Sequence, residues 1–98
     1  MIKIETFDNV WFALEKTEAD AINMTMRSDL MMAIEDAVKS WKLSQHLAAK
    51  KLGITRPRLS DLMRGKINKF SLDALTSIAH NAGLTVKMSV KKTVAKAA

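Results

Sequence analysis

The chain has 98 residues, no cysteine and a formal net charge of +6, with a sequence pI near 9.8. Its length supports one modest hydrophobic core, and the lack of cysteine excludes a disulfide framework and a thiolate metal site. No apolar run approaches the roughly 20 residues of a membrane span, and the first residues lack the apolar segment of a signal peptide, so we expect a cytoplasmic protein.

The first residues are predicted to form a small extension. Ile2 to Thr6 alternates apolar and polar side chains, which favours a short strand, and a short helix is predicted from Val10 to Lys16. Trp11 and Phe12 are large apolar residues for so small a protein. They either pack on the domain or form a possible partner surface.

Apolar residues then recur at three- and four-residue steps from about Glu18 to Lys42, which predicts one amphipathic helix. Thr17 is its expected N-cap, because the segment 17–20 resembles a capping box with Asp in the place of Glu. Three acidic residues, Asp29, Glu35 and Asp36, fall on the outer side of this helix. We interpret them as solvated helix charges, since no histidine converges with them.

The segment from Ser44 to Gly65 predicts two short helices joined by a tight turn. Ser44 is the N-cap of the first helix, and Gly53 ends it by entering the left-handed conformation that a β-carbon would disfavour. Thr55 caps the second helix, and Pro57 lies in its first turn, where a missing N–H is harmless. The connection is therefore only about three residues long.

The two helices present one apolar and one polar side. The predicted buried positions are Leu47, Ala48, Ala49, Leu52, Ile54, Leu59, Leu62 and Met63. The positions left outside on the second helix are polar and mostly cationic, namely Arg56, Arg58, Ser60, Asp61 and Arg64. This pattern is typical of a helix-turn-helix whose second helix enters the DNA major groove.

A polar loop follows the motif, and a loop in this position runs along the sugar-phosphate backbone in helix-turn-helix proteins. We therefore predict phosphate contacts from Lys66, Asn68 and Lys69. Ser71 caps a further helix whose apolar stripe closes the core and which Gly83 ends. Residues 84–90 alternate strictly between apolar and polar side chains, which predicts a strand in need of a partner.

The motif segment resembles the xenobiotic-response-element (XRE), phage-repressor-like helix-turn-helix family, in one register without a gap. The matching positions are Gln45, Ala49, Gly53, Leu59 and the Arg64-Gly65 ending. The resemblance implies a mainly α fold with a five-helix, lambda-repressor-like DNA-binding domain over residues 25–83. A helical extension over residues 1–24 would precede it, and a short β-strand with a disordered basic tail would follow over residues 84–98.

Site roles follow from the same resemblance. It implies that Gln45 contacts a phosphate and braces the reading helix, while the base-reading residues are Arg56, Arg58 and Asp61, with Ser60 next. The other expected phosphate contacts are Thr55, Arg64, Lys66, Asn68 and Lys69. Pro57 stands where relatives often carry a polar reading residue, so Arg56 and Arg58 must carry more of the readout.

The extension before the core and the strand behind it resemble antitoxins of the host-inhibition-of-growth (HigA-like) type. This similarity implies a repressor of its own operon that binds a small basic toxin of the HigB/RelE-like ribonuclease class. Residues 1–50 carry six Lys and Arg against eight Asp and Glu, a net of −2, whereas residues 51–98 carry ten against two, a net of +8. The two halves therefore suit partners of opposite charge.

These observations predict a sequence-specific transcriptional regulator, nucleoid-associated when bound to DNA and not an enzyme. One reading helix covers too few base pairs for useful affinity, so we expect a homodimer on a palindromic operator of double-stranded DNA. Catalytic constellations, cofactor motifs and metal-ligand spacings do not occur in the sequence. The alternatives are a stand-alone or phage-derived repressor, or an adaptor that uses the same helical core for protein contacts.

Overall fold

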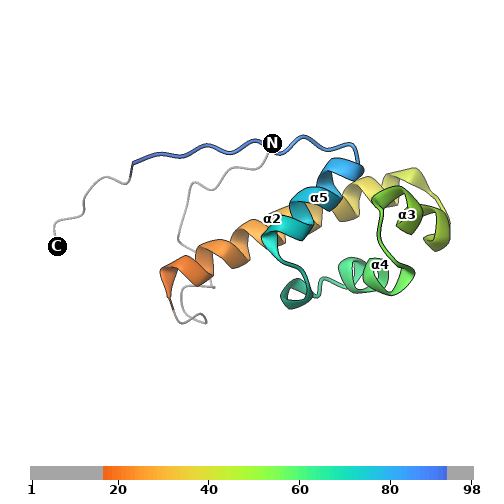
Figure 1. Ribbon diagram of the computed structural model, residues 1–98, viewed down its shortest axis with the longest axis horizontal. Helices are drawn as coiled ribbons and strands as arrows, with labels where there is room; N and C mark the ends of the chain where they lie inside the picture. Colours follow the sequence, from red (N-terminus) through yellow and green to blue (C-terminus); the bar gives the residue numbers. More distant parts are fainter. Residues whose placement is uncertain (1–16, 93–98) are drawn as a thin grey trace.

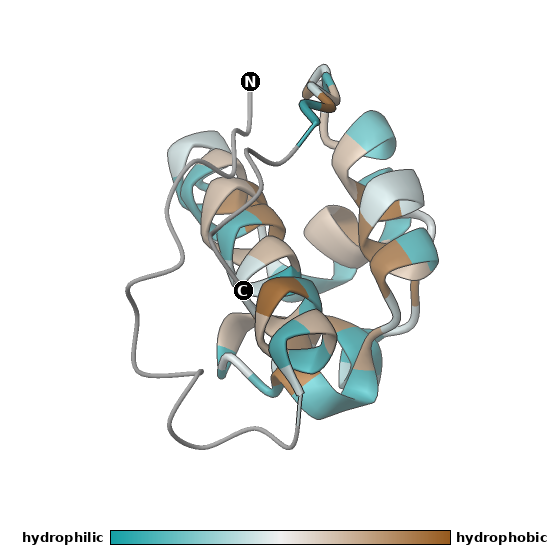
Figure 2. Ribbon diagram, turned by 90° about the vertical axis from the view of Figure 1, so that its left-hand side faces the viewer, coloured by the Kyte–Doolittle hydropathy of each residue, from teal (hydrophilic) through white to brown (hydrophobic). Residues whose placement is uncertain are grey.

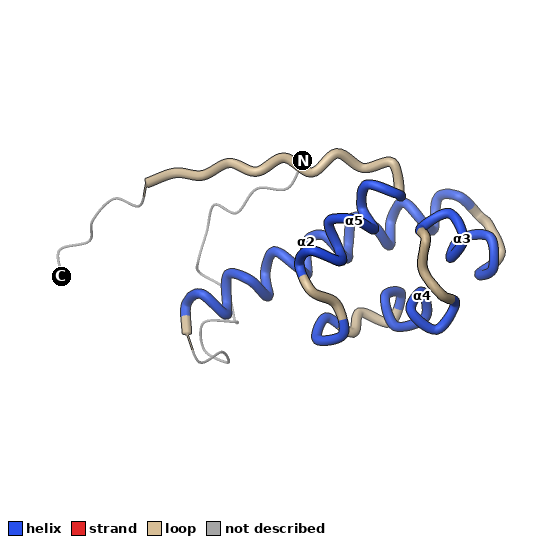
Figure 3. Tube along the Cα trace, in the orientation of Figure 1, coloured by secondary structure: helices blue, strands red, loops and turns tan. Residues whose placement is uncertain are grey.

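The computed structural model describes residues 17–92, in which a long helix and a group of shorter ones pack together (Figures 1 and 3). The described elements are the α-helices α2 (Glu18–Trp41), α3 (Gln45–Leu52), α4 (Arg56–Met63) and α5 (Leu72–Asn81), with the 3-10 helix η1 (Ile67–Lys69) between α4 and α5. The predicted N-terminal strand and short helix, with Trp11 and Phe12, lie outside the described residues. The prediction of a mainly α fold is confirmed, but residues 17–92 hold four α-helices rather than five.

Local capping signals set the ends of α2. The Thr17 hydroxyl accepts a hydrogen bond from the Asp20 N–H at 3.0 Å, so the predicted N-cap is confirmed. The helix ends after Trp41 because Lys42 adopts a left-handed conformation with φ 54° and ψ 35°. α2 packs against α5, α4 and η1, which makes it the support for both the motif and the loop behind it.

The core lies between α2 and the four shorter elements. Its largest fully buried side chains are Phe70, Met31, Ile34, Leu52, Leu62 and Leu75. Hydrophobic and hydrophilic residues alternate along each helix in Figure 2, as expected for helices with one buried face. None of the residues whose burial is described is both polar and buried, so this core is held by apolar packing.

The prediction that Leu47 is buried between α3 and α4 is wrong. We expected it in the buried set, but its side chain is 49% exposed, whereas Ala48 and Ala49 are buried. An eight-residue helix presents only a narrow stripe to its neighbours, and Ala48, Ala49 and Leu52 fill that stripe. The small side chains therefore let α3 approach its neighbours closely.

The predicted C-terminal strand is wrong for the part of the chain that the structure describes. Residues 84–92 are extended, but they form no ladder with any other described segment. A strand needs the hydrogen bonds of a neighbour, and alternation in the sequence cannot supply one. In Figure 1 this segment runs along the top, over α5 and α2, while α4 and η1 lie at the bottom.

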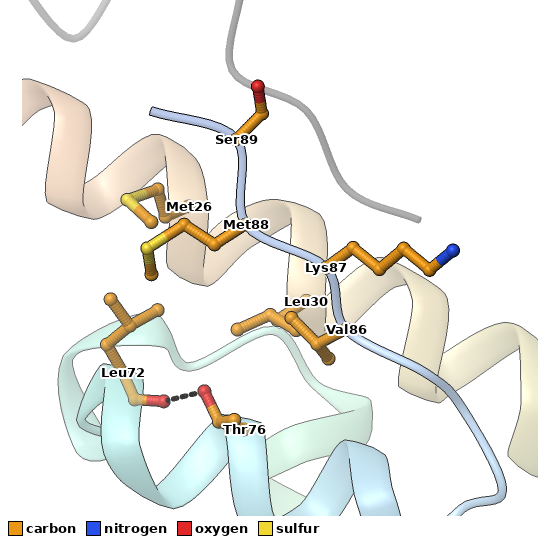
Figure 4. A pocket seen from close by; sticks show the side chains of 8 residues that line it. All are labelled: Met26, Leu30, Leu72, Thr76, Val86, Lys87, Met88 and Ser89. Carbon is orange, nitrogen blue, oxygen red and sulfur yellow. Dashed lines mark hydrogen bonds between the residues drawn. The ribbon is translucent and has the colours of Figure 1, made fainter. Parts of the chain in front are cut away.

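An apolar groove lies between this extended segment and the two helices beneath it (Figure 4). Met26 and Leu30 of α2 and Leu72 of α5 form its apolar floor, and Val86 and Met88 lie over them. Val86 is 37% exposed, Met88 is 76% exposed and Val90 is 84% exposed. The segment therefore covers the groove only in part.

The end of α3 is held by a side chain from α5. The Asn81 side-chain amide donates a hydrogen bond to the Leu52 carbonyl at 2.9 Å, which satisfies one of the free carbonyls at the end of α3. Gly53 has φ +72°, as predicted for the residue that stops the helix. A β-carbon at Gly53 would lie 3.1 Å from the Asn81 amide nitrogen.

We predict that Gly53→Ala destabilises the protein more than Gly65→Ala does. Both glycines have left-handed φ, so each substitution carries a conformational cost of about 1–2 kcal/mol. Gly65 has open space at its β-carbon position, whereas Gly53 faces Asn81, whose hydrogen bond contributes about 1 kcal/mol. Urea unfolding should show the larger loss for Gly53→Ala, and equal losses would mean that Asn81 does not restrain this turn.

Candidate nucleic-acid interface

The helix-turn-helix forms as the sequence predicts. The Ser44 hydroxyl accepts from the Leu47 N–H at 3.3 Å, and the Thr55 hydroxyl accepts from the Arg58 N–H at 3.3 Å. Only residues 53–55 connect α3 to α4, and Pro57 lies in the first turn of α4. These caps fix where α4 begins, and therefore which side chains project from its exposed end.

α4 has one sealed and one open side. Leu59 and Leu62 are buried in the core, whereas Arg56, Pro57 and Arg64 are exposed and Ser60 and Asp61 are half-buried. Gln45 and Thr55 are also exposed. The predicted interface residues of α3 and α4 are thus accessible, apart from Arg58 and Asp61, which make contacts within the domain.

A hollow lies between α3 and the start of α4, and it is lined by His46, Ala49, Lys50, Ile54, Thr55 and Arg56. From the sequence, His46 is a possible phosphate contact because it follows Gln45, whereas Lys50 is not predicted at the interface. They are four residues apart on α3, both exposed, and therefore project from the same side of that helix. The four-residue spacing in the sequence already indicates that these two side chains share one side of α3. They place two basic side chains beside Arg56.

Arg58 differs from the sequence prediction, which places it outward beside Arg56. Its Nη1 donates to the Lys69 carbonyl at 2.7 Å, and its guanidinium carbon lies 4.1 Å from the centre of the Phe70 ring. A cation over an aromatic face, with a carbonyl acceptor within reach, is stabilised in a way that an arginine surrounded by water is not. The two arginines therefore do not project together in this conformation.

Asp61 lies among the cations of the following loop. Its carboxylate oxygens are 3.5 Å from Lys66 Nζ and 3.6 Å from Lys69 Nζ. One predicted base reader is thus paired with two predicted phosphate contacts. The lysine side chains are more exposed, at 38% and 55%, than that of Asp61, at 20%. Ion pairs of surface lysines contribute little to stability, so a phosphate group can compete with the carboxylate for them.

Arg27 of α2 also contacts this loop, which the sequence analysis missed. Its Nη1 donates to the Phe70 carbonyl at 3.3 Å and to the Ile67 carbonyl at 3.4 Å, and its Nη2 donates to Met24 Sδ at 2.8 Å. The sequence does indicate that Arg27 is unusual, because it lies three residues after Met24 and three before Leu30, on the buried stripe of the helix. A cation at such a position needs polar partners.

The acidic residues of α2 do not belong to a metal-binding cluster within residues 17–92. Burial raises the pKa of Asp29 and of Glu35, and for Glu35 the neighbouring Lys39 opposes this effect while Asp36 adds to it. Within residues 17–92 no three His, Asp or Glu side chains gather closely enough to bind a metal ion. No helix in that range is both long and apolar enough to cross a membrane.

Comparison with known proteins agrees with this geometry. A family described as a helix-turn-helix domain matches residues 13–91, most of the chain. The chain belongs to this helix-turn-helix domain family, and its fold is that of DNA-binding regulators.

One solved structure resembles this chain over most of its length. A solved structure of a protein assigned to the XRE family of transcriptional regulators is 28% identical, with a TM-score of 0.70. The similarity covers 76% of this chain and 83% of that one. A search of curated proteins finds no match.

Proposed function

We propose that this protein is a sequence-specific DNA-binding transcriptional repressor whose α4 enters the major groove. The observation that carries the proposal is the placement of exposed cations around α4, whose opposite side is sealed by Leu59 and Leu62. Eight Lys and Arg and one acid lie in residues 42–69, so positive charge is concentrated at the motif. Such a surface favours a phosphate backbone through counterion release.

Base reading is assigned first to Arg56. It is exposed at the first position of α4, where it can reach a base edge, and arginine pairs in bidentate fashion with guanine. Ser60, one turn further along α4, is a second reader. Arg58 and Asp61 remain candidates, but Arg58 would have to leave Phe70 and Asp61 would have to release its lysines.

Phosphate contacts are assigned to residues around the ends of the motif. The proposed set is Gln45, Thr55, Arg64, Lys66, Asn68 and Lys69. All of them are exposed except Lys66, which is half-buried. Two copies related by a two-fold axis would place the motifs on half-sites roughly 34 Å apart on one face of a palindromic operator. The fold of the XRE-family regulator supports this assignment of DNA as the partner.

We predict different consequences for Arg56→Ala and Lys69→Ala. Arg56→Ala should relax preference at one base pair of each half-site, a loss of discrimination of about 1–3 kcal/mol. Lys69→Ala should weaken binding to all duplexes equally and reduce the salt slope by about one. Fluorescence anisotropy on a selected operator and on random duplexes measures both effects.

The same titrations test the proposed function itself. Binding to one palindrome that persists at moderate salt supports a sequence-specific regulator. Affinity that is equal on every duplex and vanishes at moderate salt would favour the adaptor. If Arg56→Ala and Lys69→Ala behaved alike on specific and random DNA, the division between reading and positioning residues would be wrong.

We predict that Asp61→Asn raises affinity for DNA of any sequence. The substitution removes the carboxylate that pairs with Lys66 and Lys69 and would repel phosphate, while it keeps the side chain's size. The gain should shrink as salt is added, because it is electrostatic. Unchanged or weaker binding to random duplexes would contradict this prediction and would point to a direct role for Asp61 in base reading.

An antitoxin is the second, finer proposal. It is supported by the net charge of −2 in residues 1–50 and by the acidic residues Asp29, Glu35 and Asp36 along α2, which suit a basic RelE-like toxin. Co-expression with the neighbouring open reading frames tests it. Recovery of a stable complex with a small basic protein, and relief of its growth inhibition, would support an autoregulating antitoxin, whereas its absence would favour a stand-alone repressor.

A further inference from the structure

The loop that follows α4 is held from two sides by arginine side chains. Arg27 of α2 donates to the carbonyls of Ile67 and Phe70, and Arg58 of α4 donates to the carbonyl of Lys69. Three carbonyls of one short segment are thus bound by two guanidinium groups. We name these two residues, with the segment from Ile67 to Phe70, the arginine clamp.

Phe70 is the centre of the clamp. Its ring is buried, its carbonyl accepts from Arg27, and its ring face lies 4.1 Å from the Arg58 guanidinium carbon. Two elements far apart in the sequence, α2 and α4, are thereby connected through one loop residue. The loop cannot shift relative to α4 without breaking contacts to at least one arginine.

The clamp has a consequence for the polar groups of the loop. The carbonyls that would repel a phosphate are occupied by guanidinium donors, whereas Asn68 makes no hydrogen bond among the described residues and is exposed. Within residues 17–92, the Lys66 and Lys69 ammonium groups are paired with the Asp61 carboxylate alone. Three carbonyls of the loop are therefore bound within the domain, while the side chain of Asn68 remains accessible.

Burial of part of the Arg27 side chain destabilises the fold unless its contacts with the loop compensate. Its side chain is half-buried, and its Nε is buried without a hydrogen-bond partner. A leucine or methionine there would continue the apolar stripe of α2 and avoid the unpaired Nε, but the Phe70 carbonyl would lose its donor. The favourable contacts of Arg27 beyond its own helix are those with the two loop carbonyls.

We propose that Arg27 and Arg58 are positioning residues that hold the loop after α4 as a preformed phosphate-binding site. The proposal rests on the DNA-binding function proposed above. Neither arginine needs to contact DNA in this role, because both act through the placement of Asn68 and Lys69 relative to α4. Preorganisation of this kind raises affinity because less ordering remains to be done on binding.

The test compares Arg27→Gln with Lys39→Gln in the full chain. Both remove one positive charge from α2, but Lys39 is exposed and has no hydrogen bond or ion pair to the loop within residues 17–92. Arg27→Gln should weaken binding about fivefold on specific and random duplexes alike and lower the salt slope, as loss of a phosphate contact does. Lys39→Gln should change both much less.

A double-mutant cycle separates positioning from a general loss of stability. If Arg27 acts through Lys69, Arg27→Gln should cost less affinity when Lys69→Ala is already present. Additive effects, or a wild-type salt slope in Arg27→Gln, would overturn the proposal. In the free protein, amide exchange at Lys69 and Phe70 should accelerate in Arg27→Gln while α3 stays protected, and unchanged exchange would also overturn it.

Arg58→Gln provides a second route if Arg27→Gln does not fold. A positioning role predicts uniform weakening across operator variants, coupled to Lys69→Ala, whereas a base-reading role predicts loss at a single base pair. The second result would overturn the assignment of Arg58. If the wild-type protein bound no duplex, the proposed function itself would be refuted. If the wild-type protein bound DNA and Arg27→Gln bound it equally well, only the positioning role would be refuted.

Discussion

The contact on which the rest of this structure depends is the seating of Phe70 beneath Arg58 and beside α2. The Phe70 ring is buried among the core residues of α2, α4 and α5, so its position is fixed by apolar packing. The loop before it carries Lys66, Asn68 and Lys69, and the helix before that loop carries Arg56. One buried ring therefore determines how the loop lies relative to the exposed end of α4.

The cationic side chains around the motif fall into two groups, which differ in how strongly they are bound to other groups of the domain. Arg27 contacts loop carbonyls in a partly buried environment, where such interactions are stronger than in water. Arg58 contacts the Lys69 carbonyl and the face of the buried Phe70 ring. Among the described residues, Lys66 and Lys69 are paired only with Asp61, at N–O distances of 3.5 and 3.6 Å, and both lysine side chains are well exposed. The first group suits a permanent structural role, whereas the second can exchange its partner for phosphate.

Two separate contacts fix the geometry of the motif, one at its turn and one after α4. At the end of α3, Asn81 of α5 holds the Leu52 carbonyl, and this contact restrains the turn that contains Gly53. At the end of α4, the arginine clamp restrains the loop. The extended segment 84–92 lies on the other side of the molecule from α4 (Figure 1), so the exposed alternating side chains there leave the proposed DNA surface free.

The sequence by itself determined the helices and their order, because the signals are local. Thr17, Ser44, Thr55 and Ser71 each cap the helix that follows through a hydrogen bond to an N–H three residues away, and Gly53 needs only its own φ angle. The charge pattern likewise predicts an interface on α4 and its loop. Such features depend on neighbours in sequence and can be read without coordinates.

Only the tertiary structure decided what the individual charged side chains do. Arg27 meets the loop across about 40 positions of sequence, and Arg58 meets Lys69 across 11, so no local pattern places them together. The predicted strand at 84–90 fails for the same reason. Its side chains alternate between apolar and polar, but no described segment pairs with it. Long-range contacts assign these roles, because a side chain's partner depends on which elements the core brings into reach.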